Sequence, residues 1–358
     1  MEIKIGDRII SKQSKPYFIA DIAANHDGDI DRAYRLIELA KEAGADAAKF
    51  QNFKAETIVS KKGFESLGSQ LSHQSSWKKS VFDTYRDASL PDLWSEKLKK
   101  KCEEVGIEYM TSPYDFASVD LADRYVNAYK IGSGDITWPE ILEYIAKKGK
   151  PVLLATGASN RADVERAVRT IEKYPVPLIL MQCNTNYTAS ASNFSYINLN
   201  VLCSYQEWYP DCIPGLSDHT FGHTTVLGAY VLGARVFEKH FTDDNDREGP
   251  DHKFSMNPVS WKQMVKACEE LREALGDGVK RIEENEQDTV HIQRRALYLQ
   301  RDLKQGDVLR EEDLFPLRPV KEGTVLPYEK QRILGKRILR DVKRDTCLMW
   351  EDIEHDKR

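Results

Sequence analysis

The chain has 358 residues, of which 41% are hydrophobic and 30% are charged, enough apolar material for a sizeable core and too much for a disordered or fibrous protein. Its length is typical of two domains, or of one large α/β barrel with an added module. The 52 Lys and Arg nearly balance the 57 Asp and Glu, so there is no basic field for nucleic acid or an anionic membrane, and an anionic substrate must be held by a few local cations.

Eight short apolar runs resemble buried strands, at residues 17–21, 47–51, 108–112, 128–132, 151–156, 177–182, 213–218 and 235–241. Amphipathic helical patterns separate most of them, at residues 30–45, 93–105, 139–148, 162–172, 224–232 and 260–275. Eight β/α alternations predict a (β/α)8 barrel. The alternative is an open doubly wound sheet, which often carries a glycine-rich nucleotide turn after its first strand; the NHDGD segment after Asp21 is not such a turn.

The rest of the chain has a different pattern. The polar segment KRIEENEQD, residues 280–288, is typical of a linker, and short strand-like pieces follow it at residues 296–299, 308–309, 337–339 and 346–349. We predict a barrel domain at 1–279, a linker at 280–291 and a small β-rich domain at 292–358. The small domain has little core of its own, so we expect docking onto a barrel rim to bury its apolar pieces. These include Leu314, Phe315 and Leu317.

The six cysteines are dispersed and form no CxxC pair, which disfavours a disulfide scaffold or a zinc ribbon and indicates a reducing cytoplasm. The first residues, MEIKIGDRII, lack the apolar stretch of a signal peptide. No run of about 18 apolar residues is present to span a membrane. We therefore expect a cytoplasmic protein.

Polar and charged residues end the predicted strands, on the face where barrel enzymes carry their active sites. They include Asp21, Lys49, Gln51, Ser112, Lys130, Ser133, Asp135, Thr185, Tyr187, Ser217 and Glu238. Unpaired buried charge is costly, so a purely structural barrel would not need Lys49, Lys130 and Glu238 there. This pattern predicts an active site. If Glu238 only pairs with one of the lysines, its role is structural.

Two histidines, His219 and His240, come from the ends of adjacent strands, so their imidazoles can meet. Two histidines with waters and a substrate oxygen suit a divalent ion such as Mn²⁺, Zn²⁺ or Co²⁺. Each histidine taken alone is more often a satisfied rim residue than a ligand. His223 and His252 are weaker candidates, and we expect His73, His291 and His355 to lie on the surface.

Lys49 and Lys130, with the hydroxyls of Ser112, Ser133 and Ser217, suggest a clamp for phosphate or carboxylate. The rival interpretation is a Schiff-base aldolase in which one lysine is the nucleophile. A Schiff-base enzyme needs no metal pair, so the two histidines argue against it.

Several motifs in order resemble the sialic acid (N-acetylneuraminate) synthase family. They include IADIAANHDGD, GADAAKFQNFKAE, YKIGSGD, LLATG, GLSDHT, EKHFTDD and GPDHKFSM, and from about Val290 the chain resembles the family's antifreeze-like (SAF) domain. The resemblance implies a (β/α)8 barrel followed by a small SAF domain, a domain-swapped homodimer and a divalent metal, with Mn²⁺ favoured over Mg²⁺ or Co²⁺. The implied reaction condenses phosphoenolpyruvate with an N-acylated hexose such as N-acetylmannosamine.

The resemblance also implies roles for single residues. His219 and His240 match the metal ligands. Lys49, Lys130, Ser133 and Ser217 match phosphoenolpyruvate-binding positions, and Ser112, Thr185 and Tyr187 fall where further phosphate or carboxylate contacts are expected. The sugar-contacting positions are matched by Gln51, Asp135, Asp251 and Arg318, the last reaching in from the partner subunit.

The implied mechanism is an attack of the phosphoenolpyruvate methylene on the sugar aldehyde, which the metal polarises. Water then adds at C2, and phosphate leaves by C–O cleavage. Lys49 and Lys130 hold the charged cosubstrate. The candidates for moving protons are Asp21, Asp135 and Glu238.

The sequence departs from the family pattern at the sugar end and in the loop after the sixth strand. Asp21 and Asp135 stand where Glu is common, Ala155 replaces a frequent Ser, and Thr188 replaces a usual Pro. These changes bear on the sugar more than on the reaction. The alternatives are therefore the same reaction on a di-N-acetylated hexose, giving legionaminic or pseudaminic acid, or on a simple hexose. A non-catalytic sugar-binding protein is disfavoured by the intact histidine and lysine set.

Overall fold

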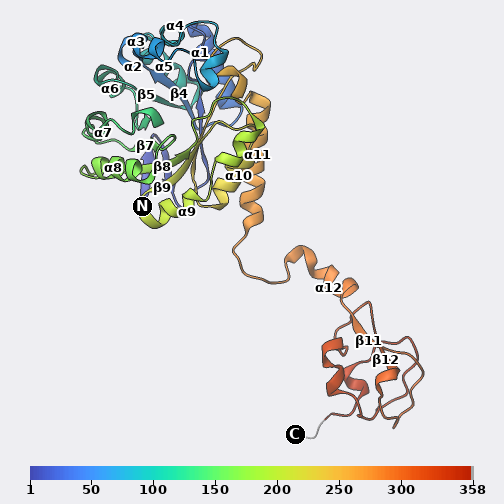
Figure 1. Cartoon of the computed structure of the whole chain (residues 1–358). Helices are drawn as coiled ribbons and strands as arrows, with labels where there is room; N and C mark the ends of the chain where they lie inside the picture. The colour runs from blue at the N-terminus through green and yellow to red at the C-terminus, as the bar shows by residue number, and fades with distance from the viewer. Residues whose placement is uncertain (356–358) are drawn as a thin grey trace. The chain divides into compact units, whose positions relative to one another are not determined.

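The structure is a computed structural model that describes residues 1–355. It divides into two compact units, Met1–Leu275 and a second that begins at Gly276, and each is considered by itself (Figure 1). Among the described residues, no helix is long and apolar enough to cross a membrane, and all six cysteines are free.

Eight parallel strands form the centre of the first unit, in the order β5-β4-β3-β10-β9-β8-β7-β6. They are β3 (Tyr17–Asp21), β4 (Ala47–Asn52), β5 (Glu108–Pro113), β6 (Tyr129–Ile131), β7 (Val152–Ala155), β8 (Leu178–Cys183), β9 (Ile213–Asp218) and β10 (Val236–His240). The first strand pairs with the last, and β5 contacts β6 to complete the circle. The predicted (β/α)8 barrel is confirmed. The open sheet is excluded, because in an open sheet the two edge strands do not contact each other.

The outer helices are α1 (Ile30–Glu42), α5 (Trp94–Val105), α6 (Phe116–Ala122), α7 (Pro139–Ala146), α8 (Arg161–Ile171), α9 (Val201–Trp208), α10 (Thr224–Val231) and α11 (Pro258–Leu275). Helix α1 shows why the chain folds this way. Asp29 caps its first turn, and Ala33, Leu36, Ile37 and Ala40 lie on one buried face at helical spacing. The helical patterns predicted from the sequence all correspond to helices, whereas α6 and α9 were not predicted.

A hairpin, β1 (Glu2–Ile5) with β2 (Arg8–Ser11), precedes the barrel and was also missed. Its inward residues Ile3, Ile5 and Ile10 are buried with Tyr17 and Ile19 in an apolar cluster of inward-facing strand residues. Because Tyr17 begins β3, the hairpin packs at the N-terminal end of the strands, which leaves the C-terminal end for a site.

The longest excursion from the barrel is the segment between β4 and α5, residues 53–93, called here the β4–α5 segment. It contains α2 (Ala55–Ile58), α3 (Lys61–Ser66), the 3₁₀ turn η1 (Ser72–Ser76) and α4 (Val81–Ala88). Further 3₁₀ turns lie in the other loops, at η2 (Ser133–Asp135), η3 (Ala191–Tyr196) and η4 (His252–Phe254). The segment has its own small apolar cluster around Val59 and Val81, to which Trp77 and Tyr85 contribute.

The second unit contains helix α12 (Gln287–Gln293) and an antiparallel pair, β11 (Ala296–Leu299) with β12 (Leu314–Leu317). Its 3₁₀ turns are η5 (Glu284–Glu286), η6 (Glu311–Asp313), η7 (Pro327–Arg332) and η8 (Trp350–Asp352). Single bridges link the pieces predicted at 308–309, 337–339 and 346–349.

The expectation that the second unit has little core was wrong. Its buried apolar residues are Leu297, Leu299, Leu303, Leu309, Leu314, Val325, Ile333, Ile338, Val342, Leu348 and Ile353. They are scattered one at a time among turns, so no periodic pattern in the sequence indicated a common core. Leu314 is buried inside this unit, whereas the Phe315 side chain on the opposite face of β12 is 52% exposed.

Candidate active site

Four buried charges meet at the C-terminal mouth of the barrel, and we call Asp21, Lys49, Lys130 and Glu238 the charged quartet. Lys49 Nζ lies 2.7 Å from Asp21 Oδ2 and 3.9 Å from Glu238 Oε2, and Lys130 Nζ lies 3.0 Å from Glu238 Oε1. Each of these side chains is at most 5% exposed. Glu238 therefore pairs with the ammonium groups of both Lys49 and Lys130. The pairing of Glu238 with a lysine, which the sequence analysis left open, is present.

Burial would raise the pKa of Glu238, but Lys130 and Lys49 outweigh it and lower that pKa to about 2. For Lys49, burial would lower the pKa, but Asp21 and Glu238 outweigh it and hold the pKa above its ordinary value. At neutral pH, Glu238 is therefore an anion and Lys49 a cation. These ion pairs hold Glu238 and Lys49 in a fixed electrostatic frame, whereas burial raises the pKa of Asp21 against the opposing effect of Lys49.

The hydroxyls predicted to bind an anion surround this frame. Ser217 Oγ donates to Glu238 Oε1 at 3.0 Å, and Lys49 Nζ donates to Ser112 Oγ at 3.4 Å. Ser133 Oγ accepts from the Gly157 N–H at 2.9 Å. A Cβ on Gly157 would stand 2.4 Å from Thr185 Cγ2 and 2.9 Å from Ser133 Oγ, so glycine is needed for this close packing.

His219 and His240 lie side by side, with ring centroids 5.4 Å apart, as their adjacent strands predicted. His219 Nδ1 is 2.8 Å from the carbonyl oxygen of Asn184. A carbonyl only accepts, so Nδ1 carries the proton and Nε2 keeps its lone pair. Burial lowers the pKa of His219 to about 3 and that of His240 to about 4, so both rings are neutral.

These residues fit a divalent ion held at an open site. Two neutral imidazoles are available, and the buried His240 Nδ1 has no hydrogen-bond partner. Carboxylates stand close by, with Asp21 Oδ2 3.6 Å from His240 Nε2 and Asp251 Oδ2 3.9 Å from its Nδ1. Within residues 1–355, no three His, Cys, Asp or Glu side chains form a preassembled ligand set, so water or substrate oxygens would complete the coordination. His252 is not available for this, because it pairs with Asp27.

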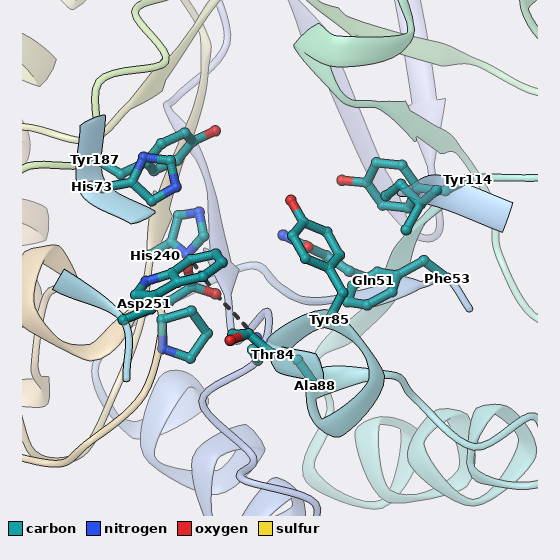
Figure 2. Close-up of a pocket in the computed structure, with 14 residues that line it drawn as sticks. Gln51, Phe53, His73, Thr84, Tyr85, Ala88, Tyr114, Tyr187, His240 and Asp251 are labelled. Carbon is teal, nitrogen blue, oxygen red and sulfur yellow. Dashed lines mark hydrogen bonds and ion pairs between the residues drawn. The ribbon is translucent and has the colours of Figure 1, made fainter. Parts of the chain in front are cut away.

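A cavity of about 170 Å³ opens beside the histidines (Figure 2). Gln51, Tyr187, His240 and Asp251 line it, as do side chains that the sequence analysis did not single out. These are Phe53, His73, Trp77, Tyr85 and Tyr114, all but Tyr114 from the β4–α5 segment. His73, expected on the surface, is half-buried and lines this cavity, with its ring 4.9 Å from that of Tyr187. The sequence analysis predicted no element between residues 53 and 92, so it gave no indication of these positions.

The remaining predicted residues lie in three different places. Tyr187, expected near the anion site, packs on His219 with ring centroids 4.2 Å apart and belongs to the cavity wall. Asp135 lies in η2 beyond Lys130, where burial raises its pKa to about 7 against the opposing effect of Lys130. Arg318 is an exposed residue of the second unit and has no hydrogen bond or ion pair among the described residues.

Comparison with known proteins gives the family. Residues 36–280 match the NeuB family, and residues 294–354 match the SAF domain. The chain belongs to the NeuB family. This confirms the resemblance found in the sequence.

Relatives of this chain are named as synthases of different sugar acids. The chain is 33% identical to the N,N'-diacetyllegionaminic acid synthase of Campylobacter jejuni, over 93% of this chain and 99% of the relative. It is 30% identical to the human N-acetylneuraminate-9-phosphate synthase, over 98% and 96% of the two chains. The crystal structure of the N-acetylneuraminic acid synthetase from Leptospira borgpetersenii, with citrate bound, is 27% identical with a TM-score of 0.70, covering 81% of this chain and 95% of that one.

The raised pKa of Asp135 predicts a pH-dependent stability difference. The folded chain resists ionisation of Asp135 up to about pH 7, whereas the unfolded chain ionises it near its ordinary value of 3.8, so stability is lost between these two pH values. Asp135→Asn removes this cost. Urea unfolding should show the variant gaining stability over the native chain at pH 8 and no such gain at pH 4. An equal difference at both pH values would contradict the raised pKa.

The histidine pair predicts a metal affinity that depends on both rings. His219→Ala and His240→Ala should each weaken Mn²⁺ binding by about 100-fold or more, because losing even an outer partner of a ligand costs 10- to 100-fold. Titration calorimetry of metal-stripped protein measures this, and circular dichroism checks the fold. His223→Ala, on the same rim but outside this pair, is the matched control. Unchanged Mn²⁺ affinity in both variants would exclude this site.

Proposed function

We propose that this NeuB-family chain condenses phosphoenolpyruvate with an N-acylated hexose, giving a nine-carbon 2-keto-3-deoxy acid and phosphate. The charged quartet beside a neutral histidine pair is the observation that carries the proposal. It places two cations among the hydroxyl groups of Ser112, Ser133 and Ser217 at the barrel mouth. A compact trianion such as phosphoenolpyruvate suits this concentration of donors.

Different residues of the site have different roles in this reaction. Lys49 and Lys130 hold the phosphate and the carboxylate of phosphoenolpyruvate. Glu238 and Asp21 fix the positions of the two lysine ammonium groups. A divalent ion on His219 and His240 would supply a Lewis acid for the aldehyde oxygen. Burial raises the pKa of Asp135 to about 7 and also raises that of Asp21, whereas the pKa of Glu238 is about 2, so Asp135 and Asp21 are better suited than Glu238 to move a proton near neutral pH.

The Schiff-base alternative is disfavoured by the state of the lysines. A nucleophilic lysine must be neutral, which requires a lowered pKa. Lys49 has a raised pKa, and Lys130 is paired with Glu238 at 3.0 Å. We therefore expect borohydride to trap no covalent adduct with pyruvate.

We also propose a homodimer in which Arg318 contacts the sugar bound by the partner subunit. The support is family membership, the exposed and unpaired state of Arg318 among the described residues, and the polar segment 280–288 near the start of the second unit. The six free cysteines are consistent with a cytoplasmic enzyme.

The proposed reaction predicts release of inorganic phosphate from phosphoenolpyruvate only when an acceptor sugar is present. Lys130→Ala should raise the apparent KM for phosphoenolpyruvate by about 10- to 150-fold, since a charge-assisted contact contributes about 1.5–3 kcal/mol. The KM for the sugar should change much less. Lys148→Ala, a surface lysine on the barrel exterior, is the control. Phosphate release without any sugar, or an unchanged KM for phosphoenolpyruvate, would contradict the assignment.

The dimer proposal predicts that two inactive variants restore each other. Arg318→Ala and His219→Ala subunits are each expected to be inactive, but a mixed dimer has one site with an intact barrel and an intact partner arginine. Phosphate release should therefore return after subunit exchange. Exchange is verified with differently tagged subunits, and no recovery after verified exchange would show that Arg318 does not act in trans.

A further inference from the structure

Two buried charged residues stand directly before the two histidines and take no part in the site described above. Asp218 is the last residue of β9 and precedes His219, and Lys239 precedes His240 at the end of β10. Because successive side chains of a strand point to opposite faces, Asp218 and Lys239 lie on the face away from Glu238 and the barrel mouth. Both side chains are at most 2% exposed.

The carboxylate of Asp218 connects three elements of the barrel. It forms an ion pair with Lys239, its register partner on β10. Its Oδ1 accepts from the backbone N–H of Thr220 at 3.2 Å, and its Oδ2 accepts from Thr225 Oγ1 at 2.7 Å. Thr225 lies in the first turn of α10. The ion pair therefore joins β9 and β10 to the turn after β9 and to the helix that follows it.

Lys239 binds both neighbours of His219. Its Nζ pairs with the Asp218 carboxylate and donates to the carbonyl oxygen of Thr220 at 2.7 Å. The ladder between β9 and β10 ends at the register pair of Asp218 and Lys239. His240 is still held in register with β3, whereas His219 lies beyond the last residue of β9. The side chain of Lys239 thus continues the connection between the two strands past the end of their ladder, on both sides of His219.

We propose that Lys239 and Asp218 are positioning residues that fix His219 beside His240 and so set the affinity of the histidine pair for a divalent ion. They act through the backbone of His219 and not by contact with the ion. Ligand distances in a metal site are held within about 0.2 Å, so a small shift of one imidazole weakens binding. This rests on the proposed metal site, and it is independent of the sugar and of phosphoenolpyruvate.

The first test removes the two donors of Lys239 and measures Mn²⁺ binding. Lys239→Met keeps a long apolar stem, and it should weaken Mn²⁺ binding to the metal-stripped full-length protein by about 10- to 100-fold, the usual cost of losing an outer partner of a ligand. Calorimetry is done at a temperature where circular dichroism shows every variant folded. Leu98→Ala, which opens a cavity under α5, is the control for destabilisation and should keep the native affinity.

A double variant separates positioning from stability. Lys239→Met leaves Asp218 as an unpaired buried charge, which is destabilising, whereas Lys239→Met with Asp218→Asn removes that charge. The double variant should therefore recover much of the urea midpoint. Its Mn²⁺ affinity should stay as weak as in Lys239→Met, because the donor to the Thr220 carbonyl is still missing. Native affinity in Lys239→Met, or affinity that recovers together with stability, would show that the pair serves only folding.

A second readout needs no metal. The Nδ1 proton of His219, held by the carbonyl of Asn184, can be followed by NMR of metal-free protein labelled with nitrogen-15 histidine, and His219→Ala identifies its signal. In Lys239→Met this proton should exchange with water at least tenfold faster. If the native chain bound no Mn²⁺, the proposed metal site would fail, but this exchange rate would still decide the positioning role. A rate in Lys239→Met equal to that of the native chain would overturn it.

Discussion

The site depends on the compensation of two lysines buried at the barrel mouth. Removing an ammonium group from water costs several kcal/mol unless an anion and hydrogen bonds replace the solvent. Glu238 compensates the charge of both lysines, and Asp21 forms a second ion pair with Lys49. Because alternate residues of each strand point inward, the barrel holds these four side chains on rigid backbone at its mouth.

The residues at the C-terminal rim of the barrel come from two kinds of element, the ends of the strands and the long β4–α5 segment. Strand ends carry the charges and the two histidines, which need fixed spacing for their chemistry. The β4–α5 segment carries aromatic rings that need only to cover an apolar portion of a ligand. Loops on a rigid scaffold can change without disturbing the fold, which is how one barrel serves several related substrates. In this chain, Trp77 and Tyr85 belong both to the cavity wall and to the apolar cluster of the segment, so the packing of the segment also sets the shape of that wall.

Much of the fold and part of the site could be predicted from local pattern. Short apolar runs and helical spacing located the eight strands and six of the helices, and the residue types at strand ends located the quartet and the histidines. His73 was misplaced and the aromatic wall was missed, because an irregular segment has no period. The core of the second unit was missed for a similar reason: Leu303, Val325 and Ile333 stand singly between turns and meet only after the chain has folded.

By itself, the sequence determined the barrel, its order of elements and the side chains at its active face, since strand alternation and the β/α repeat are local properties of the chain. Only the tertiary structure decided which charges pair, which ring nitrogen carries a proton and which side chains enclose the cavity. Glu238 lies between Lys49 and Lys130 because β10 and β6 face each other across the barrel mouth, and the carbonyl of Asn184 sets the tautomer of His219 from another strand's loop. These contacts join residues far apart in sequence, and local spacing contains no information about their distances.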